Sequence, residues 1–428
     1  MSLKEKLNTL FGVVSKIAEL GKIFLLTVLA SRVLAIEAFG AFALLLSISS
    51  IVAVLAEFRL QEILYKESAR SEDPAVVTFD FFCLALAFSF IGYVALQLIS
   101  LTPITDGANP DVYFLYGLVF FLGVGRVFKI SLLAKGITLP VFAIEVFSGL
   151  VAVIYLLALY FDNAVFTLEH IVYARLIDGV IALIGGSVVF TMIYGTGFHL
   201  PNLRKLGLYL TQSLPLVFSG VSVIAYQKID QIMVKQILGL EPLAIYSANL
   251  QTVATLAIIP TIFAQILARK VYSDENKNNY QLRVTYMKKV TGIGLLLTLF
   301  TFLLGELLVQ TLFGDAYRMS YAAFIFLAIT PLLTAIGASS THILVADGAQ
   351  GLVWVKSIVA LVINVVLNLI LIPRLGILGG AISTASALLF GNLLSNYLIS
   401  SYRYVFALQL QSFLYSHNNR HTWYRPES

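Results

Sequence analysis

Residues 76–100 read VVTFDFFCLALAFSFIGYVALQLIS and carry one charged side chain, that of Asp80. A helix needs about 20 mostly apolar residues to cross a ~30 Å hydrocarbon core, so this stretch predicts a membrane-spanning helix. Similar stretches recur along almost all of the 428 residues, of which 59% are hydrophobic and 12% charged. Soluble domains carry roughly a quarter charged residues. The sequence therefore predicts an all-α, polytopic membrane protein.

The apolar stretches place about twelve spans. They are expected at residues 10–34, 39–57, 76–100, 111–132, 139–160, 166–194, 207–236, 242–268, 290–313, 319–343, 352–372 and 377–400. With the N-terminus inside, Lys and Arg gather in the cytoplasmic loops, as the positive-inside rule requires, so both termini are expected in the cytoplasm. We expect two six-helix bundles, residues 1–205 and 206–403, and a cytoplasmic tail, residues 404–428.

A weak internal repeat relates the two halves. RVLAIEAFGAF at 32–42 aligns with QILGLEPLAIY at 236–246, and LLAKG at 132–136 aligns with LVADG at 344–348. Six spans precede each second copy, so the two halves share one orientation. Parallel repeats of this kind are typical of transporters in which two bundles move around a central site, although apolar segments also resemble one another by chance.

Charged residues inside the spans are the candidate functional residues, because an ionisable side chain at a helix centre is unfavourable by about 2.5–3.5 kcal/mol. No carboxylate obviously neutralises every cation, so we expect a cationic cavity that binds an anionic substrate. Its predicted residues are Lys16, Lys22, Arg126, Arg175, Lys228 and Lys356. The carboxylates are predicted to exchange H⁺ or Na⁺ as the coupling ion, and they are Glu19, Asp80, Glu145, Asp178, Asp230 and Glu306.

Two alternatives compete with this interpretation. Asp80, Arg126 and Lys129 lie close to the expected cytoplasmic boundary, where long side chains can snorkel to the interface. Arg175 and Asp178 are three residues apart and could form a pair within one helix.

Other kinds of chemistry leave no pattern in the sequence. No Walker lysine loop and no G-x-S-x-G elbow occur, no catalytic residues are identified, and the five histidines lack the spacing of a metal site. Cys83 is the only cysteine, which excludes a cysteine-based metal site. The net charge of +5 is explained by cationic cytoplasmic loops, so nucleic-acid binding is not expected. The chain is therefore predicted not to be an enzyme and not to need a cofactor.

Two motifs give a specific resemblance. NVVLNLILIPRLGILGGAIST at 364–384 and IDQIMVKQILGLEPLAIYSANLQ at 229–251 resemble motifs of the polysaccharide-exporter branch of the MOP superfamily, which also contains MATE and MurJ-like proteins. The resemblance covers the whole chain in length, number of spans and arrangement in halves.

The resemblance implies a Wzx-type flippase of the bacterial inner membrane. Such a protein moves undecaprenyl-pyrophosphate-linked oligosaccharide repeat units of O-antigen, capsule or exopolysaccharide across the bilayer by ion-coupled alternating access. A polysaccharide polymerase and chain-length machinery are its expected partners. MurJ-like members usually have about two more spans, which argues against lipid II as the substrate.

Two other functions remain open. A MATE-like antiporter of drugs or cations would favour carboxylates in the N-terminal bundle, where this chain has Lys16 and Lys22. A membrane polysaccharide polymerase or glycosyltransferase would normally present a large loop, and the outer loops here are short.

Overall fold

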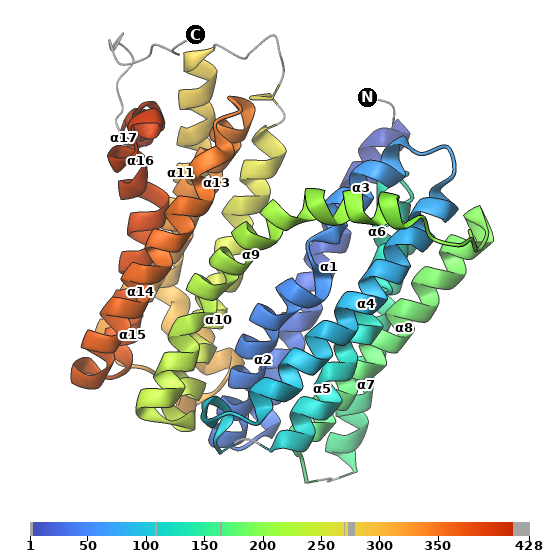
Figure 1. Cartoon of the computed structure of the whole chain (residues 1–428). Coiled ribbons are helices and arrows are strands. Elements are labelled where there is room, and N and C mark those ends of the chain that lie inside the picture. The colour runs from blue at the N-terminus through green and yellow to red at the C-terminus, as the bar shows by residue number, and fades with distance from the viewer. Residues whose placement is uncertain (1–2, 108, 163–164, 269, 273–278, 414–428) are drawn as a thin grey trace. The chain divides into compact units, whose positions relative to one another are not determined.

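The chain is described from a computed structural model, which covers residues 3–107, 109–162, 165–268, 270–272 and 279–413. Within these ranges the side chains of residues 3–10, 13, 16, 219 and 350 are not described. The described residues form helices throughout and no strand (Figure 1), so the predicted all-α fold is confirmed.

Residue contacts divide the chain into two compact units, Met1–Ile224 and Ala225–Ser428, and the division falls inside helix α9. The first unit contains α1 Leu3–Val33, α2 Ile36–Glu57, α3 Leu60–Arg70, α4 Pro74–Ser100, α5 Pro110–Gly123, α6 Arg126–Ala134, α7 Leu139–Phe161, α8 Leu168–Tyr194 and the first part of α9 Leu203–Leu238. The second contains the rest of α9, α10 Leu240–Ala268, α11 Tyr280–Leu312, α12 Tyr321–Ala328, α13 Thr330–Ala346, α14 Val353–Leu375, α15 Ile377–Leu389, α16 Ser395–Leu398 and α17 Arg403–Phe413.

Eleven helical segments among the described residues are long and apolar enough to cross a membrane. Each lies on one of the expected spans from the second to the twelfth, with α5 and α6 together forming one span and α12 and α13 another. The first expected span lies in α1, a helix of 31 residues that carries Lys16, Glu19 and Lys22 and is not among the eleven. Apolar length predicted these helices because the bilayer thickness sets it.

Helix α4 shows how the sequence sets a helix start. Asp73 precedes Pro74, and its Oδ1 accepts hydrogen bonds from the backbone N–H groups of Ala75 at 3.1 Å and Val76 at 3.3 Å. An N-cap carboxylate followed by proline is a favourable helix start. The carboxylate accepts from backbone N–H groups that have no partner within the helix, and the φ angle of proline is already that of a helix. In the first unit α4 packs against α5, α5 packs against α8, and α8 packs against α7 (Figure 1).

The repeat LLAKG and LVADG has the same local structure in both units. Gly136 and Gly348 follow the ends of α6 and α13 with φ of 75° and 68°, the left-handed conformation that glycine adopts without a Cβ clash. In each copy the residue after the glycine donates a backbone hydrogen bond back across the helix end, Ile137 to Leu132 at 2.9 Å and Ala349 to Leu344 at 2.8 Å. This is the Schellman type of helix termination. Two matching ends support the duplication.

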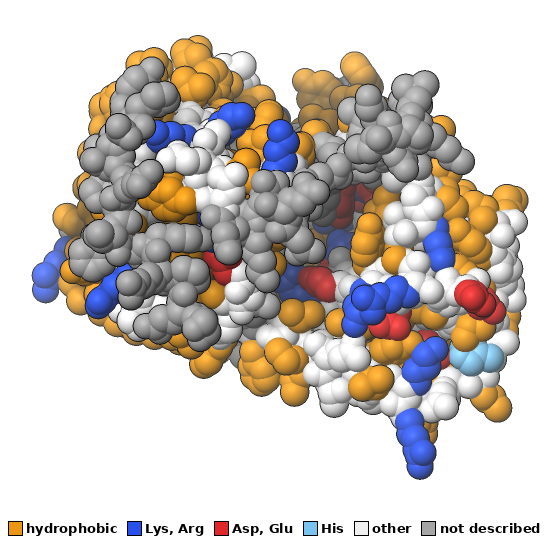
Figure 2. All heavy atoms as spheres, turned by 90° about the horizontal axis from the view of Figure 1, so that it is seen from above, with side chains coloured by type: hydrophobic (Ala, Val, Ile, Leu, Met, Phe, Trp, Pro, Cys, Tyr) orange, Lys and Arg blue, Asp and Glu red, His pale blue; other side chains and the backbone are white. Residues whose placement is uncertain are grey.

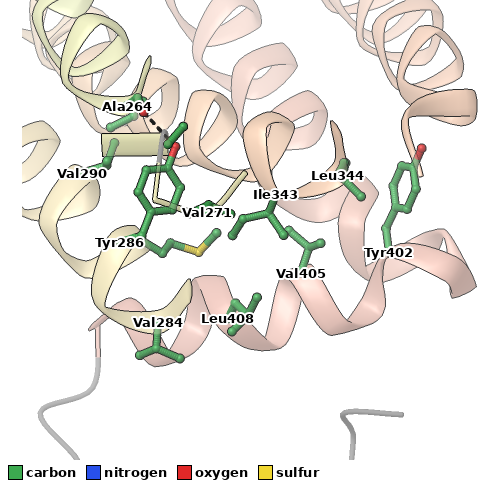
Figure 3. Close-up of a cluster of buried hydrophobic side chains, with 13 residues drawn as sticks. Ala264, Val271, Val284, Tyr286, Val290, Ile343, Leu344, Tyr402, Val405 and Leu408 are labelled. Carbon is green, nitrogen blue, oxygen red and sulfur yellow. Dashed lines mark hydrogen bonds between the residues drawn. The ribbon is translucent and has the colours of Figure 1, made fainter. Parts of the chain in front are cut away.

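The C-terminal segment is not all tail. Residues 403–413 form α17, and Val405 and Leu408 are fully buried against side chains of α11 and α13 (Figure 3). The hydroxyl of Tyr286 closes the same cluster by donating to the carbonyl of Ala264 at 3.2 Å. Burial of apolar side chains at about 25 cal/mol per Å² holds α17 on the unit. Residues 414–428 lie outside the described residues.

Candidate functional site: a charged cavity in the first unit

The charged side chains of α1, α6, α7 and α8 meet inside the first unit. Lys22 Nζ lies 2.6 Å from Glu145 Oε2 and 2.7 Å from Asp178 Oδ1, and it donates to Ser148 Oγ at 3.2 Å. Lys129 Nζ donates to the other oxygen of Glu145. These side chains are 4–11% exposed, so the network is nearly buried. Buried charges are tolerated when they are paired and hydrogen-bonded, as they are here.

A tight approach between α6 and α8 brings this network together. A Cβ on Gly125, the residue before α6, would lie 2.6 Å from the backbone Cα of Leu183 in α8. Only glycine fits at this distance, because real Cβ atoms do not approach a backbone carbon so closely. The contact places the start of α6, with Arg126 and Lys129, beside Arg175 and Asp178 of α8.

Two cavities adjoin the network, and both are lined within the first unit. The larger, of about 180 Å³, is bordered by polar or charged side chains of Ser49, Ser50, Glu57, Gln61, Ser89, Tyr116, Arg126 and Arg175. The smaller, of about 70 Å³, is bordered by the charged side chains of Glu19, Lys22, Arg126, Lys129, Glu145, Arg175 and Asp178. Arg126 and Arg175 are the charged residues common to both linings.

The two arginines give each cavity a cationic excess. Glu57 is the one carboxylate beside Arg126 and Arg175 in the lining of the larger cavity, and four cations face three carboxylates around the smaller cavity, so the formal net charge is +1 in both. Arg126 Nη1 donates to Glu57 Oε1. Arg175 Nε is buried and has no hydrogen-bond acceptor among the described residues. A buried guanidinium N–H without an acceptor is unfavourable, which marks a position where an anion would be stabilised.

Several sequence expectations about this unit are corrected. Lys22 is not an unneutralised cation, because two carboxylates from other helices pair with it. Asp178 has its ion pair with Lys22 and not with Arg175 of its own helix. Lys129 is buried and paired, so it does not snorkel. Lys16 was expected in the cationic cavity, and its side chain lies outside the described residues. The cationic excess therefore rests on the two arginines.

Asp80 lies apart from both cavities. It is 1% exposed and contacts His199 Nε2 at 3.0 Å and Lys205 Nζ at 3.3 Å. His199 belongs to the segment that joins α8 to α9, and Lys205 belongs to the first turn of α9. The alternative in which Asp80 snorkels to the interface is therefore wrong, because the buried carboxylate contacts the connecting segment and the start of α9.

The second unit holds the other predicted residues in separate places. Asp230 Oδ2 accepts hydrogen bonds from Tyr246 Oη at 2.6 Å and Thr384 Oγ1 at 2.8 Å, and its Oδ1 accepts from the N–H of Gln231 at 2.7 Å. These residues come from the two sequence motifs, which therefore meet at one buried carboxylate. Lys228 has no ion pair among the described side chains.

Lys356 and Glu306 have different surroundings. Lys356 is 6% exposed, donates to Asn396 Oδ1 at 2.7 Å and lies 5.7 Å from the centre of the Tyr402 ring. A neutral acceptor and an aromatic face thus replace a carboxylate. Glu306 was expected inside a span as an ion-coupling carboxylate. Its side chain is exposed instead, and it forms an ion pair with Arg318 at 2.5 Å.

Comparison with known proteins identifies the family. A family model described as polysaccharide biosynthesis protein matches residues 28–322, which include Glu57, Arg126 and Arg175. The chain belongs to this family. Among curated relatives of this polysaccharide biosynthesis protein is the capsular polysaccharide biosynthesis protein CapF of Staphylococcus aureus, 26% identical over 191 residues. The match covers 42% of the chain and 47% of CapF, so it spans about half the length of that relative.

Solved structures show that this polysaccharide biosynthesis protein has the fold of the MOP superfamily. An inward-facing MATE family multidrug transporter gives a TM-score of 0.69 at 16% identity, covering 94% of this chain and 96% of that one. The lipid II flippase MurJ in an inward closed conformation gives 0.62 at 15% identity, covering 96% and 91%. At these identities the likeness concerns the fold. It confirms the fold that the two motifs indicated. Together with the eleven helical segments that are long and apolar enough to cross a membrane, this fold supports a multi-pass membrane protein.

Not every residue of the site was identified from the sequence. Glu57 is the last residue of an expected span and was not among the predicted residues, although it is the counter-ion of Arg126. Tyr246 and Thr384 were inside the motifs but were not assigned a role. Their one signal was that a polar side chain recurs in an otherwise apolar motif.

Proposed function

We propose that this protein is a flippase that moves an oligosaccharide linked to undecaprenyl pyrophosphate across the bacterial inner membrane. The observation that carries the proposal is the pair Arg126 and Arg175, which borders both cavities beside the charged network and gives each a formal charge of +1. Membership of the polysaccharide biosynthesis family and the fold shared with MurJ support the same function.

A pyrophosphate suits the two guanidinium groups better than a neutral sugar does. Arginine presents parallel N–H donors that match phosphate oxygens, and charge-assisted hydrogen bonds of this kind are about twice as strong as neutral ones. Arg175 Nε is a buried donor that an anionic oxygen would satisfy. In this proposal the polyprenyl tail stays in the lipid, the pyrophosphate contacts the arginines, and the glycan crosses by alternating access.

We further propose that buried carboxylates carry the coupling ion, H⁺ or Na⁺. Asp230 is 1% exposed and is bonded to hydroxyl groups and a backbone N–H, and no ion pair to it exists among the described residues. A buried carboxylate that forms no ion pair can gain a proton or Na⁺ favourably. Asp178 and Glu145, which both pair with Lys22, are the candidate coupling carboxylates of the first unit.

The remaining assignments follow from the same proposal. We also propose that both termini are cytoplasmic, as the positive-inside pattern of the sequence indicates. The end of the first unit that carries α3 displays Lys and Arg side chains beside Asp and Glu (Figure 2). A polysaccharide polymerase and chain-length machinery would take the translocated repeat unit. The protein itself would act as an exporter, not as an enzyme.

Transport in vesicles tests the proposal. The full chain is reconstituted with a fluorescent polyprenyl-pyrophosphate-linked sugar, and its appearance in the opposite leaflet is measured with a membrane-impermeant quencher. We expect Arg175→Gln to slow translocation by about tenfold or more, because one charged hydrogen-bonding group is lost. The control Arg318→Gln removes an exposed arginine of the second unit and should retain the wild-type rate. Equal rates in both variants would refute the proposed cavity.

The same vesicles separate the flippase from a MATE-like antiporter. Tetraphenylphosphonium, a lipophilic cation, serves as the probe. A cavity with a cationic excess should not accumulate it, and transport of this cation in place of the lipid-linked sugar would show a cation antiporter.

A further inference from the structure

The corner between α2 and α3 has an unfavourable backbone. Phe58 and Arg59 follow one another with φ of 45° and 50°, in the left-handed region that residues other than glycine rarely adopt. Two such residues persist only where side-chain contacts hold them. The ring of Phe58 stacks on Phe88 with centroids 4.1 Å apart, and Arg59 Nη1 lies 3.3 Å from Glu62 Oε1.

Glu57 precedes this corner and is held from both sides. Its Oε1 accepts from Arg126 Nη1, and its Oε2 accepts from Gln61 Nε2 at 2.8 Å. All three residues line the larger cavity. The side chains of Glu57 and Arg126 are 35% and 39% exposed, so a ligand can reach the pair. Ion pairs this accessible exchange readily, because solvent weakens them.

Arg126 has N–H donors beyond the one that bonds Glu57. A guanidinium carries five N–H donors in a fork that matches two oxygens of a phosphate, and within the described part of the chain Glu57 takes one of them. A monodentate carboxylate is thus the protein's own anion at a group suited to a bidentate phosphate.

We propose that Glu57 occupies the anion position on Arg126 when no ligand is bound, and that a phosphate-bearing ligand displaces it and releases the α2–α3 corner. This inference rests on the proposed binding of an anionic lipid at Arg126. It makes Glu57 an internal competitor of the substrate, and the backbone of Phe58 and Arg59 the element that responds to binding.

The direction in which a Glu57 substitution changes anion affinity distinguishes a competitor from a residue with a structural role. If Glu57 competes with the ligand, removing its charge tightens anion binding. If Glu57 only orients Arg126, the same change weakens binding.

Calorimetry measures the affinity of the purified full chain in detergent for farnesyl pyrophosphate, and so gives the direction of this change. Farnesol is the uncharged reference. We expect Glu57→Gln to bind about two- to fivefold more tightly than the wild type, the range of an accessible ion pair. Glu306→Gln removes the same charge from an exposed ion pair of the second unit and should bind as the wild type does. Arg126→Gln should bind about tenfold or more weakly.

Each outcome has its own meaning. Equal or weaker binding by Glu57→Gln, with weaker binding by Arg126→Gln, overturns the competitor role and leaves the anion site standing. Unchanged binding by Arg126→Gln refutes the anion site and, with it, this inference. Amide hydrogen exchange at residues 58–62 of the unmodified chain adds a test that needs no variant. Farnesyl pyrophosphate should speed exchange there, and unchanged or slower exchange would overturn the release of the corner.

Discussion

Glu145 is the residue on which the charged network of the first unit depends. It is 4% exposed and pairs with both Lys22 and Lys129, whose side chains are 11% and 10% exposed. Glu145→Gln keeps the shape and removes the charge, which leaves two nearly buried ammonium groups with one carboxylate, Asp178, between them. Breaking one buried pair in this way lowers the free energy of unfolding by about 3–5 kcal/mol.

The single cysteine provides an assay for this change. Cys83 is a free, partly buried thiol in α4, so a maleimide dye that fluoresces on reaction reports unfolding in detergent. The matched control is Glu306→Gln, which breaks the exposed pair with Arg318 and should lower stability by no more than about 1 kcal/mol. The double variant Glu145→Gln/Lys129→Met removes one stranded cation and should recover part of the loss. A Glu145→Gln variant as stable as Glu306→Gln would refute the buried network.

Three more predictions follow from individual sites. Gly125→Ala places a Cβ 2.6 Å from the backbone of Leu183, so it should lower the free energy of unfolding by about 1–3 kcal/mol in the same dye assay, and an unchanged value would contradict the close approach of α6 and α8. Asp230→Asn should abolish the dependence of transport on an imposed H⁺ or Na⁺ gradient while the protein stays folded, and retained dependence would remove Asp230 from ion coupling. Lys228→Ala should reduce surface polysaccharide in cells without lowering the amount of protein in the membrane, whereas wild-type polymer would show that this cation is dispensable.

The spans could be predicted from the sequence because bilayer thickness fixes their apolar length, and α4 or α14 needed no other information. The expected boundary between the bundles was less accurate. Position 205 looked like a loop, yet α9 continues from Leu203 to Leu238 and the units divide at 224/225 within it. Hydropathy marks where a helix is apolar and gives no account of which neighbours it packs against.

The charged site shows what sequence spacing leaves undetermined. The chain separates Lys22 from Asp178 by 156 residues, and no local pattern predicts that they pair. Helix periodicity instead suggested Arg175 with Asp178, since residues three apart share a face. The identity of the charged residues was readable because charges in apolar spans stand out, and their partners depend on how five helices pack.

The central claim is that Arg126 and Arg175 bind the phosphate of a lipid-linked glycan. Its most direct test is an electron cryomicroscopy structure of the full chain in lipid nanodiscs with a polyprenyl-pyrophosphate-linked sugar. We expect phosphate density within about 2.7–2.9 Å of both guanidinium groups, with Glu57 moved away from Arg126. Phosphate density bound elsewhere, with the Arg126 to Glu57 pair intact and Arg175 Nε still without an acceptor, would contradict it.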